Sequence, residues 1–182
     1  MSRIFSSLCV VSTILLIVAL VLGLNIDDAK ELSSRGAVSN HMLMALAALV
    51  FALLVHAILL TYFMGTGRWL EETSNAYKLS PDYCERSAKL KYSTIPLMTG
   101  ALFLLIVTGA FGAASDPLSR VQFQGWLGLS AAQIHYLIAC LTVGTNVVVN
   151  LLEYLAIHQN GQLIKEVLGE VRRIRQEHGL PV

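Results

Sequence analysis

The chain has 182 residues, of which 55% are apolar and 14% charged, whereas soluble globular domains usually carry about a quarter charged residues. This low charge content argues against a soluble enzyme. The formal net charge of +1 excludes the global basic excess that drives sequence-independent binding to nucleic acid. We therefore expect the lipid bilayer, and not nucleic acid, to be a partner of this chain.

Four apolar stretches are long enough to cross a membrane. A helix needs about 20 mostly apolar residues to cross the hydrocarbon core, where all backbone polar groups must be satisfied internally. No small-x-small cleavage pattern follows residue 24, so we expect the first stretch to be a retained helix and not a signal peptide. The predicted spans are residues 8–24, 41–64, 95–114 and 131–157.

Lys and Arg are distributed unevenly between the connecting segments, which predicts the orientation. With the N-terminus inside, the outer loops hold only Lys30, Arg35 and Arg120, and the other ten Lys and Arg residues lie inside. The sequence therefore predicts an all-α integral membrane protein in the cell membrane. Its fold is a single-domain four-helix bundle, up-down-up-down, with both termini cytoplasmic.

Two helical extensions are expected on the cytoplasmic side. Residues 65–78 continue the second span until Pro81, and residues 161–178 form a second helix after the fourth span. This last helix either lies on the anionic inner leaflet, docks a partner helix, or packs on the protein's own cytoplasmic loop. Its apolar residues, at 3-4-3 spacing, are Ile164, Val167, Val171 and Ile174.

The sequence predicts a tandem duplication of a helical hairpin, with repeats at residues 1–80 and 90–175. The motif Leu-Leu-Ile-Val at residues 15–18 recurs at residues 104–107. Two such hairpins would run in the same direction across the membrane, related by a pseudo-two-fold axis along its normal. The most informative equivalent pairs are Gly23 with Gly112, Asp27 with Asp116, and His41 with His135.

The fourth span carries a line of polar residues that we call the polar stripe. At about 100° per residue, its members lie within about 60° of His135 and face the bundle, not lipid. Within it, Glu153 either relays protons along the stripe or snorkels to the inner interface. The stripe consists of Thr142, Asn146, Asn150 and Glu153.

Three histidines lie within the second and fourth spans. His41 and His135 are either helix-entry residues in interfacial water or axial ligands of a haem iron, which needs nitrogen donors from both sides. Ser130 and Gln133 form the pattern of a capping box, which puts His135 in the first two turns of its helix.

The third histidine, His56, lies on the second span together with a row of small residues. It either hydrogen-bonds to Asn150, its counterpart under the repeat, or ligates a metal. Small residues on the same helical face either let helices approach closely or leave room for a flat cofactor. These residues are Ala45, Ala48 and Ala52.

A four-helix membrane bundle whose second and fourth helices carry histidines about four turns apart resembles the haem-carrying bundle of membrane b-type cytochromes. The resemblance implies a haem b held by His41 and His135 near the outer face, with His56 as one ligand of an inner haem. The remaining inner position is occupied by Asn150, which is not an expected haem ligand. One outer haem is therefore what the resemblance supports.

Several functions are compatible with these features. The first is a small haem b-binding electron-transfer subunit of a respiratory-type complex, not catalytic on its own. The alternative is a non-catalytic scaffold or assembly subunit that docks other membrane or cytoplasmic subunits, or a second copy, through its cytoplasmic helices. A channel would need an oligomer, and a copper site could use His41, Met44 and His135.

Overall fold

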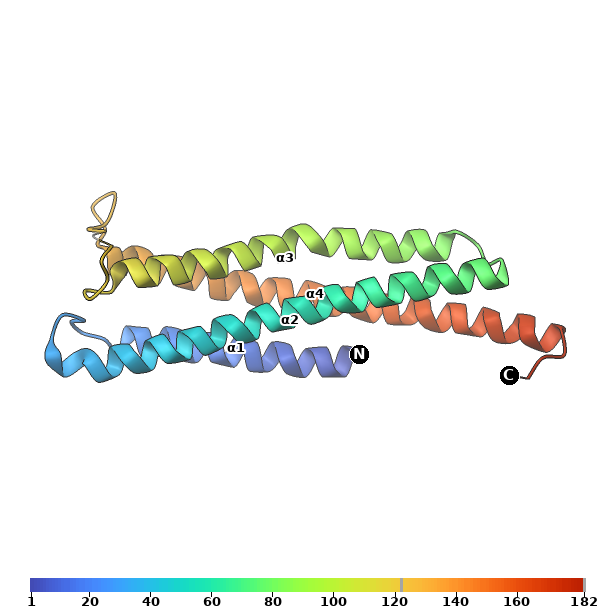
Figure 1. The fold of residues 1–182 in the computed structure, drawn as a ribbon, viewed down its shortest axis with the longest axis horizontal. Helices are drawn as coiled ribbons and strands as arrows, with labels where there is room; N and C mark the ends of the chain where they lie inside the picture. Colours follow the sequence, from blue (N-terminus) through green and yellow to red (C-terminus); the bar gives the residue numbers. More distant parts are fainter. Residues whose placement is uncertain (122, 182) are drawn as a thin grey trace.

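The structure, a computed structural model, describes residues 1–121 and 123–181, and these form an elongated all-helical bundle (Figure 1). Consecutive long helices run antiparallel. Because α1 packs mainly against α2 and α3 mainly against α4, the bundle consists of two hairpins. The elements are α1 (Ser2–Leu24), the short 3-10 helix η1 (Leu32–Ser34), α2 (Arg35–Tyr77), α3 (Asp82–Ser115) and α4 (Ala131–Glu177).

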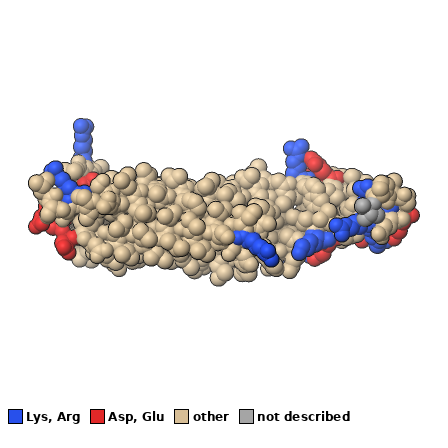
Figure 2. Space-filling model, turned by 90° about the horizontal axis from the view of Figure 1, so that it is seen from below, with Lys and Arg blue, Asp and Glu red and all other residues tan. Residues whose placement is uncertain are grey.

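Each of the four long helices contains a segment that is long and apolar enough to cross a membrane. The shortest, α1, has 23 residues and at 1.5 Å per residue is about 35 Å long, close to the thickness of a hydrocarbon core. Figure 2 shows a broad band without Lys, Arg, Asp or Glu on the face in view, with charged residues at one end and from about the middle of the molecule to the other end. The prediction of four span-length helices is confirmed.

The third helix begins earlier than predicted. It starts at Asp82, directly after Pro81, and continues through Pro96, so residues 82–94 are helical and not a loop. Acidic residues in the first turn, Asp82 and Glu85, favour this start because they complement the positive end of the helix dipole. The predicted boundary at residue 95 marked only where the apolar segment begins.

The second and fourth helices continue beyond the N-terminus of α1, as predicted, and pack there against the first part of α3 (Figure 1). We call residues 67–93 and 161–177 the stalk. Its core consists of Leu70, Leu163 and Val167, all buried. Arg86 of α3 also pairs with Glu166 of α4 at 2.8 Å. Of the three alternatives for the last helix, the structure therefore shows packing on the protein's own helices.

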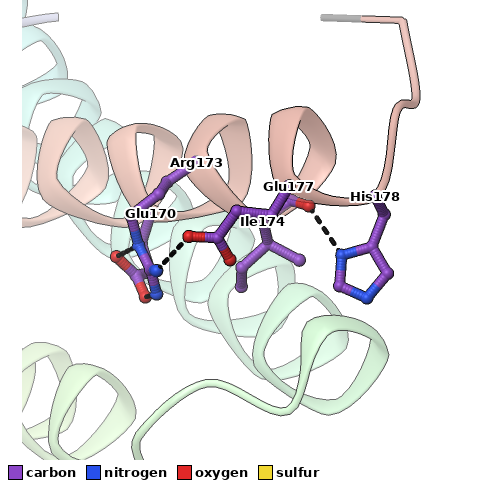
Figure 3. A network of polar contacts seen from close by, with 5 residues as sticks. All are labelled: Glu170, Arg173, Ile174, Glu177 and His178. Atoms are coloured by element: carbon purple, nitrogen blue, oxygen red, sulfur yellow. Dashed lines mark hydrogen bonds and ion pairs between the residues drawn. The ribbon is translucent and has the colours of Figure 1, made fainter.

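The outer face of the stalk is polar. Arg173 bonds to Glu170 and to Glu177, each at 2.6 Å, and the His178 ring donates to the Ile174 carbonyl at 2.9 Å (Figure 3). The hydrogen bond from Arg173 lowers the pKa of Glu170. Because these charges are exposed to water, they contribute little to stability.

The core of the bundle changes in character along its axis. Large side chains fill the half next to the stalk, including Phe5, Leu59 and Phe63. The other half ends at the connections 25–34 and 116–130, which we call the loop end, and small residues such as Ala48 and Ala52 are buried there. The two halves therefore differ in how closely side chains can fill the space between the hairpins.

Candidate functional site

His41 and His135 lie opposite each other near the loop end, one from each hairpin. Their ring centroids are 6.1 Å apart, and the ring planes are nearly perpendicular, at 77°. Both side chains are half-buried. The structure thus brings together the two histidines that the sequence predicts as a pair.

Each of these rings rests against a glycine of the partner helix in its own hairpin. A Cβ atom added at Gly23 would lie 2.9 Å from Cε1 of His41, and one added at Gly112 would lie 3.0 Å from Cε1 of His135. Real Cβ atoms essentially never approach as closely as at Gly23, and the contact at Gly112 is tighter than nine in ten real ones, so a larger residue at either position would require the ring to shift. The two glycines therefore set the depth at which the imidazoles lie.

Hydrogen bonding determines which nitrogen of His41 is available. Nδ1 lies 2.9 Å from the Ala19 carbonyl oxygen. A carbonyl can only accept, so Nδ1 carries the hydrogen and donates it, which leaves Nε2 with a free lone pair. Metal-binding histidines are usually oriented in this way. Nδ1 of His135 is buried and has no hydrogen-bond partner among the described residues.

A cavity of about 1110 Å³ lies between the two hairpins at the loop end. Both histidines line it, together with residues of all four helices and of both connections. Its volume is slightly above the range of about 300–1,000 Å³ in which small-molecule sites usually fall. Small residues that line it are Gly23, Ala45, Ala48, Gly109, Gly112 and Ala139.

The second polar site lies toward the stalk and is closed. His56 and Glu153 are 1% and 0% exposed, and Nδ1 of His56 lies 2.9 and 3.1 Å from the two carboxylate oxygens. Nε2 of the same ring lies 3.3 Å from Oδ1 of Asn146. Both nitrogens of His56 are thus engaged, and the ring is not free to ligate a cofactor.

Two predictions about this site are wrong. His56 was expected to bond to Asn150, but its partner is Glu153, while both polar atoms of the Asn150 side chain are buried without a partner among the described residues. The alternative in which Glu153 snorkels to the interface also fails, because His56 holds the carboxylate inside the bundle. The reason is the axial position of α2 relative to α4. It differs from the predicted one by three residues of α4, so Glu153 and not Asn150 lies beside His56.

The polar stripe faces the bundle interior, as predicted. All four members are 5% exposed or less. The Thr142 hydroxyl lies 2.6 Å from that of Thr108 in α3, and the Asn146 amide donates to the Thr142 carbonyl at 2.9 Å. Ser130 and Gln133 form the predicted capping box at the start of α4.

Sequence reasoning did not assign a role to the glycines that support the rings. Gly23 and Gly112 were noted only as matching positions of the repeat, and that match was the one signal that could have pointed to them. Met44, considered as a copper ligand, packs against the apolar cluster around Ala48 and is not among the residues that line the cavity.

Comparisons with family models, with curated proteins and with solved structures give no match for this chain. The site must therefore be interpreted from its own geometry.

Proposed function

We propose that this protein is a haem b-binding electron-transfer subunit of a membrane complex, with His41 and His135 as the axial ligands. The observation that carries the proposal is the pair of imidazoles, one from each hairpin, that lie 6.1 Å apart and both line a cavity with several small residues. A bound haem iron would supply a one-electron couple at this position.

The donor set fits an iron held within a macrocycle. The two ring centroids are 6.1 Å apart, so both imidazoles could hold one haem iron, for which histidine is a usual protein ligand. The described residues contain no group of three or more His, Cys, Asp or Glu side chains that could hold a metal ion. Two histidines alone leave the other positions of the metal open, and a porphyrin provides four donors.

The chain's own residues have distinct tasks in this proposal. The Ala19 carbonyl holds the His41 ring in the orientation that leaves Nε2 free. Gly23 and Gly112 let both rings lie close to the neighbouring helix. The small residues between the hairpins leave room for a flat molecule.

The proposal is limited to one haem. Both nitrogens of His56 are hydrogen-bonded, and Asn150 is not an expected ligand of iron. The resemblance to the b-type cytochromes therefore extends only to the outer ligand pair.

We also propose that the bundle spans the cell membrane with the stalk and both termini in the cytoplasm, and that it arose by duplication of one hairpin. The distribution of Lys and Arg supports the orientation. The glycine–histidine contact that occurs once in each hairpin supports the duplication. Labelling of single cysteines introduced at Ser33 and Gln176 in intact cells would test the orientation: only the first should react with an impermeant reagent.

The visible absorption spectrum of the detergent-purified protein tests the haem assignment. We expect a reduced-minus-oxidised difference spectrum typical of a b-type haem. It should be lost in His41→Ala and in His135→Ala and retained in His158→Ala, which changes an exposed histidine of α4 that bonds to Gln162.

A featureless spectrum above the protein band in the wild type, after expression with sufficient haem supply, would overturn the proposal. The scaffold function would then become the leading candidate. The structure gives that function little specific support, because the apolar residues of the last helix pack against α2 and α3 of the same chain.

A further inference from the structure

Ser12 and Asn150 come from different helices, and neither side chain has a hydrogen-bond partner among the described residues. Ser12 of α1 is 1% exposed and Asn150 of α4 is 5% exposed. The Ser12 hydroxyl and both polar atoms of the Asn150 amide are buried without a hydrogen-bond partner among the described residues. Such groups are rare in native proteins and require an explanation, of which a bound water or ligand is a common one.

The neighbouring apolar clusters relate the level of the hydroxyl on α1 to that of the amide on α4. On α1, Cys9 precedes the hydroxyl by one turn and packs against the cluster that contains Ile157 of α4. Leu16 follows it by one turn and belongs to the cluster that contacts Val143 of α4. Helices α1 and α4 pack against each other, and Asn150 is midway between Ile157 and Val143. We therefore infer that the hydroxyl on α1 lies near the level of α4 that carries this amide.

This level is also that of the buried His56–Glu153 pair. Asn150 lies three residues before Glu153 and four after Asn146, so the three side chains share one face of α4. All of them point into the core. The unpartnered atoms therefore border the ion pair.

The hydrogen bonds determine how many protons the pair holds. The Asn146 amide donates to the Thr142 carbonyl, so its Oδ1 faces His56 and must accept from Nε2–H. On the other side of the ring, Nδ1 lies 2.9 Å from a carboxylate oxygen, and two lone pairs cannot face each other at that distance. One proton is therefore shared between Nδ1 and Glu153, and the pair is neutral as a whole.

The surroundings add no further charge. From α1, the titratable group near the pair is the thiol of Cys9, and the tyrosines packed against the same cluster are Tyr62 and Tyr154. The buried residues of α3 are all uncharged: Ser87, Thr94, Met98, Ala101 and Leu105. A neutral pair in an uncharged core favours a neutral guest over a cation, and the available donors and acceptors are those that bind water.

We propose that Ser12 and Asn150 bind water beside the His56–Glu153 pair. Through this water, the proton shared by His56 and Glu153 exchanges with the bulk solvent. The site is separate from the cavity between the hairpins and needs no cofactor. It gives the bundle core an exchangeable proton beside a histidine that is itself 1% exposed.

Water-edited NMR of isotopically labelled protein in lipid nanodiscs tests the first part. We expect transfer of magnetisation from water to the side-chain amide of Asn150. The matched control is the Asn160 amide, which is 0% exposed and donates to Tyr62 and Thr66. Transfer to Asn150 no stronger than to Asn160 would overturn the proposal.

Exchange of the His56 ring hydrogen in D₂O tests the second part. Ser12→Ala and Asn150→Leu should each slow this exchange at least tenfold, because they remove the groups that hold the water. Unchanged exchange in both variants would contradict a path through this site. If Asn150→Leu fails to fold, Ser12→Ala alone decides the question, because it removes a single atom. Neither measurement depends on haem in the cavity.

Discussion

The two histidine sites in the bundle have similar sequence surroundings and opposite structures. His41 and His135 face a cavity and are half-buried, whereas His56 is 1% exposed and bonded through both nitrogens. All three lie on helices that contain a segment apolar enough to cross a membrane. The sites differ in the residues next to each ring. His41 and His135 lie beside each other, whereas His56 lies beside the Glu153 carboxylate and the Asn146 amide.

The packing around the two sites explains this difference. Near His56, large side chains such as Phe5, Leu59 and Phe63 fill the core and leave the histidine 1% exposed. Near His41 and His135, alanines and glycines leave the hairpins apart. A closed site must satisfy its polar groups internally, whereas an open site can present them to a ligand.

The largest effect is expected from breaking the buried pair. Glu153→Leu should lower the free energy of unfolding by about 3–5 kcal/mol, because it leaves His56 buried without its partner. The double variant His56→Leu/Glu153→Leu should lose much less, since it removes both polar groups. Equilibrium unfolding in detergent micelles measures both values. Equal losses in the single and double variants would show that the two residues are not coupled.

Core truncations should show that the two halves of the bundle are packed differently. Leu59→Ala, in the closed half, should cost about 3 kcal/mol because a cavity remains. Leu20→Ala, at the cavity wall, should cost clearly less, because part of that side chain already faces open space. The same unfolding measurement compares them, and a greater loss for Leu20→Ala would contradict the distinction.

Substitution of the supporting glycines tests the geometry of the open site. Gly112→Ala should lower the free energy of unfolding by about 1 kcal/mol through the clash with His135, and reduce haem retention about tenfold or more. Gly109→Ala is the matched control: it lies one turn away, lines the same cavity, and has no atom within 4 Å of an added Cβ. There we expect a gain of up to about 1 kcal/mol from the better helix former. Equal results at both glycines would argue against a supporting role.

The smallest effect is expected at the exposed pair of the stalk, which contrasts with the buried one. Arg173→Gln should raise the pKa of Glu170 toward its ordinary value, as measured by NMR titration of the carboxyl. Because Arg173 lowers this pKa, the pair contributes its stability above the ordinary pKa of a glutamate and loses it as the pH falls through the lowered value. The melting temperature at neutral pH should not change measurably, and a clear drop would show a larger structural role.

The sequence predicted the helices better than it predicted their partners. Hydropathy located four apolar segments, and the angular position of Thr142, Asn146, Asn150 and Glu153 placed them correctly in the interior. Residues 82–94 were missed as a helix because they are too polar to be found by hydropathy. The capping box at Ser130 was recognised because its two residues are local in sequence.

The partner of each buried polar group was less predictable. The residue that faces His56 depends on the axial level of α2 against α4, and a difference of one turn exchanges Asn150 for Glu153. The contacts of Gly23 with His41 and of Gly112 with His135 likewise depend on how each hairpin closes.

The sequence by itself determined that this protein has four helices long and apolar enough to cross a membrane, and that one helix turns a polar face inward. These properties follow from the hydropathy of a segment and from the helical repeat of 3.6 residues per turn. Both can be read from a single segment of the sequence. Only the tertiary structure decided that His56 is buried and hydrogen-bonded to Glu153, while His41 and His135 lie close to each other and line a cavity. That choice depends on the relative levels and side-chain volumes of different helices, which no single segment contains.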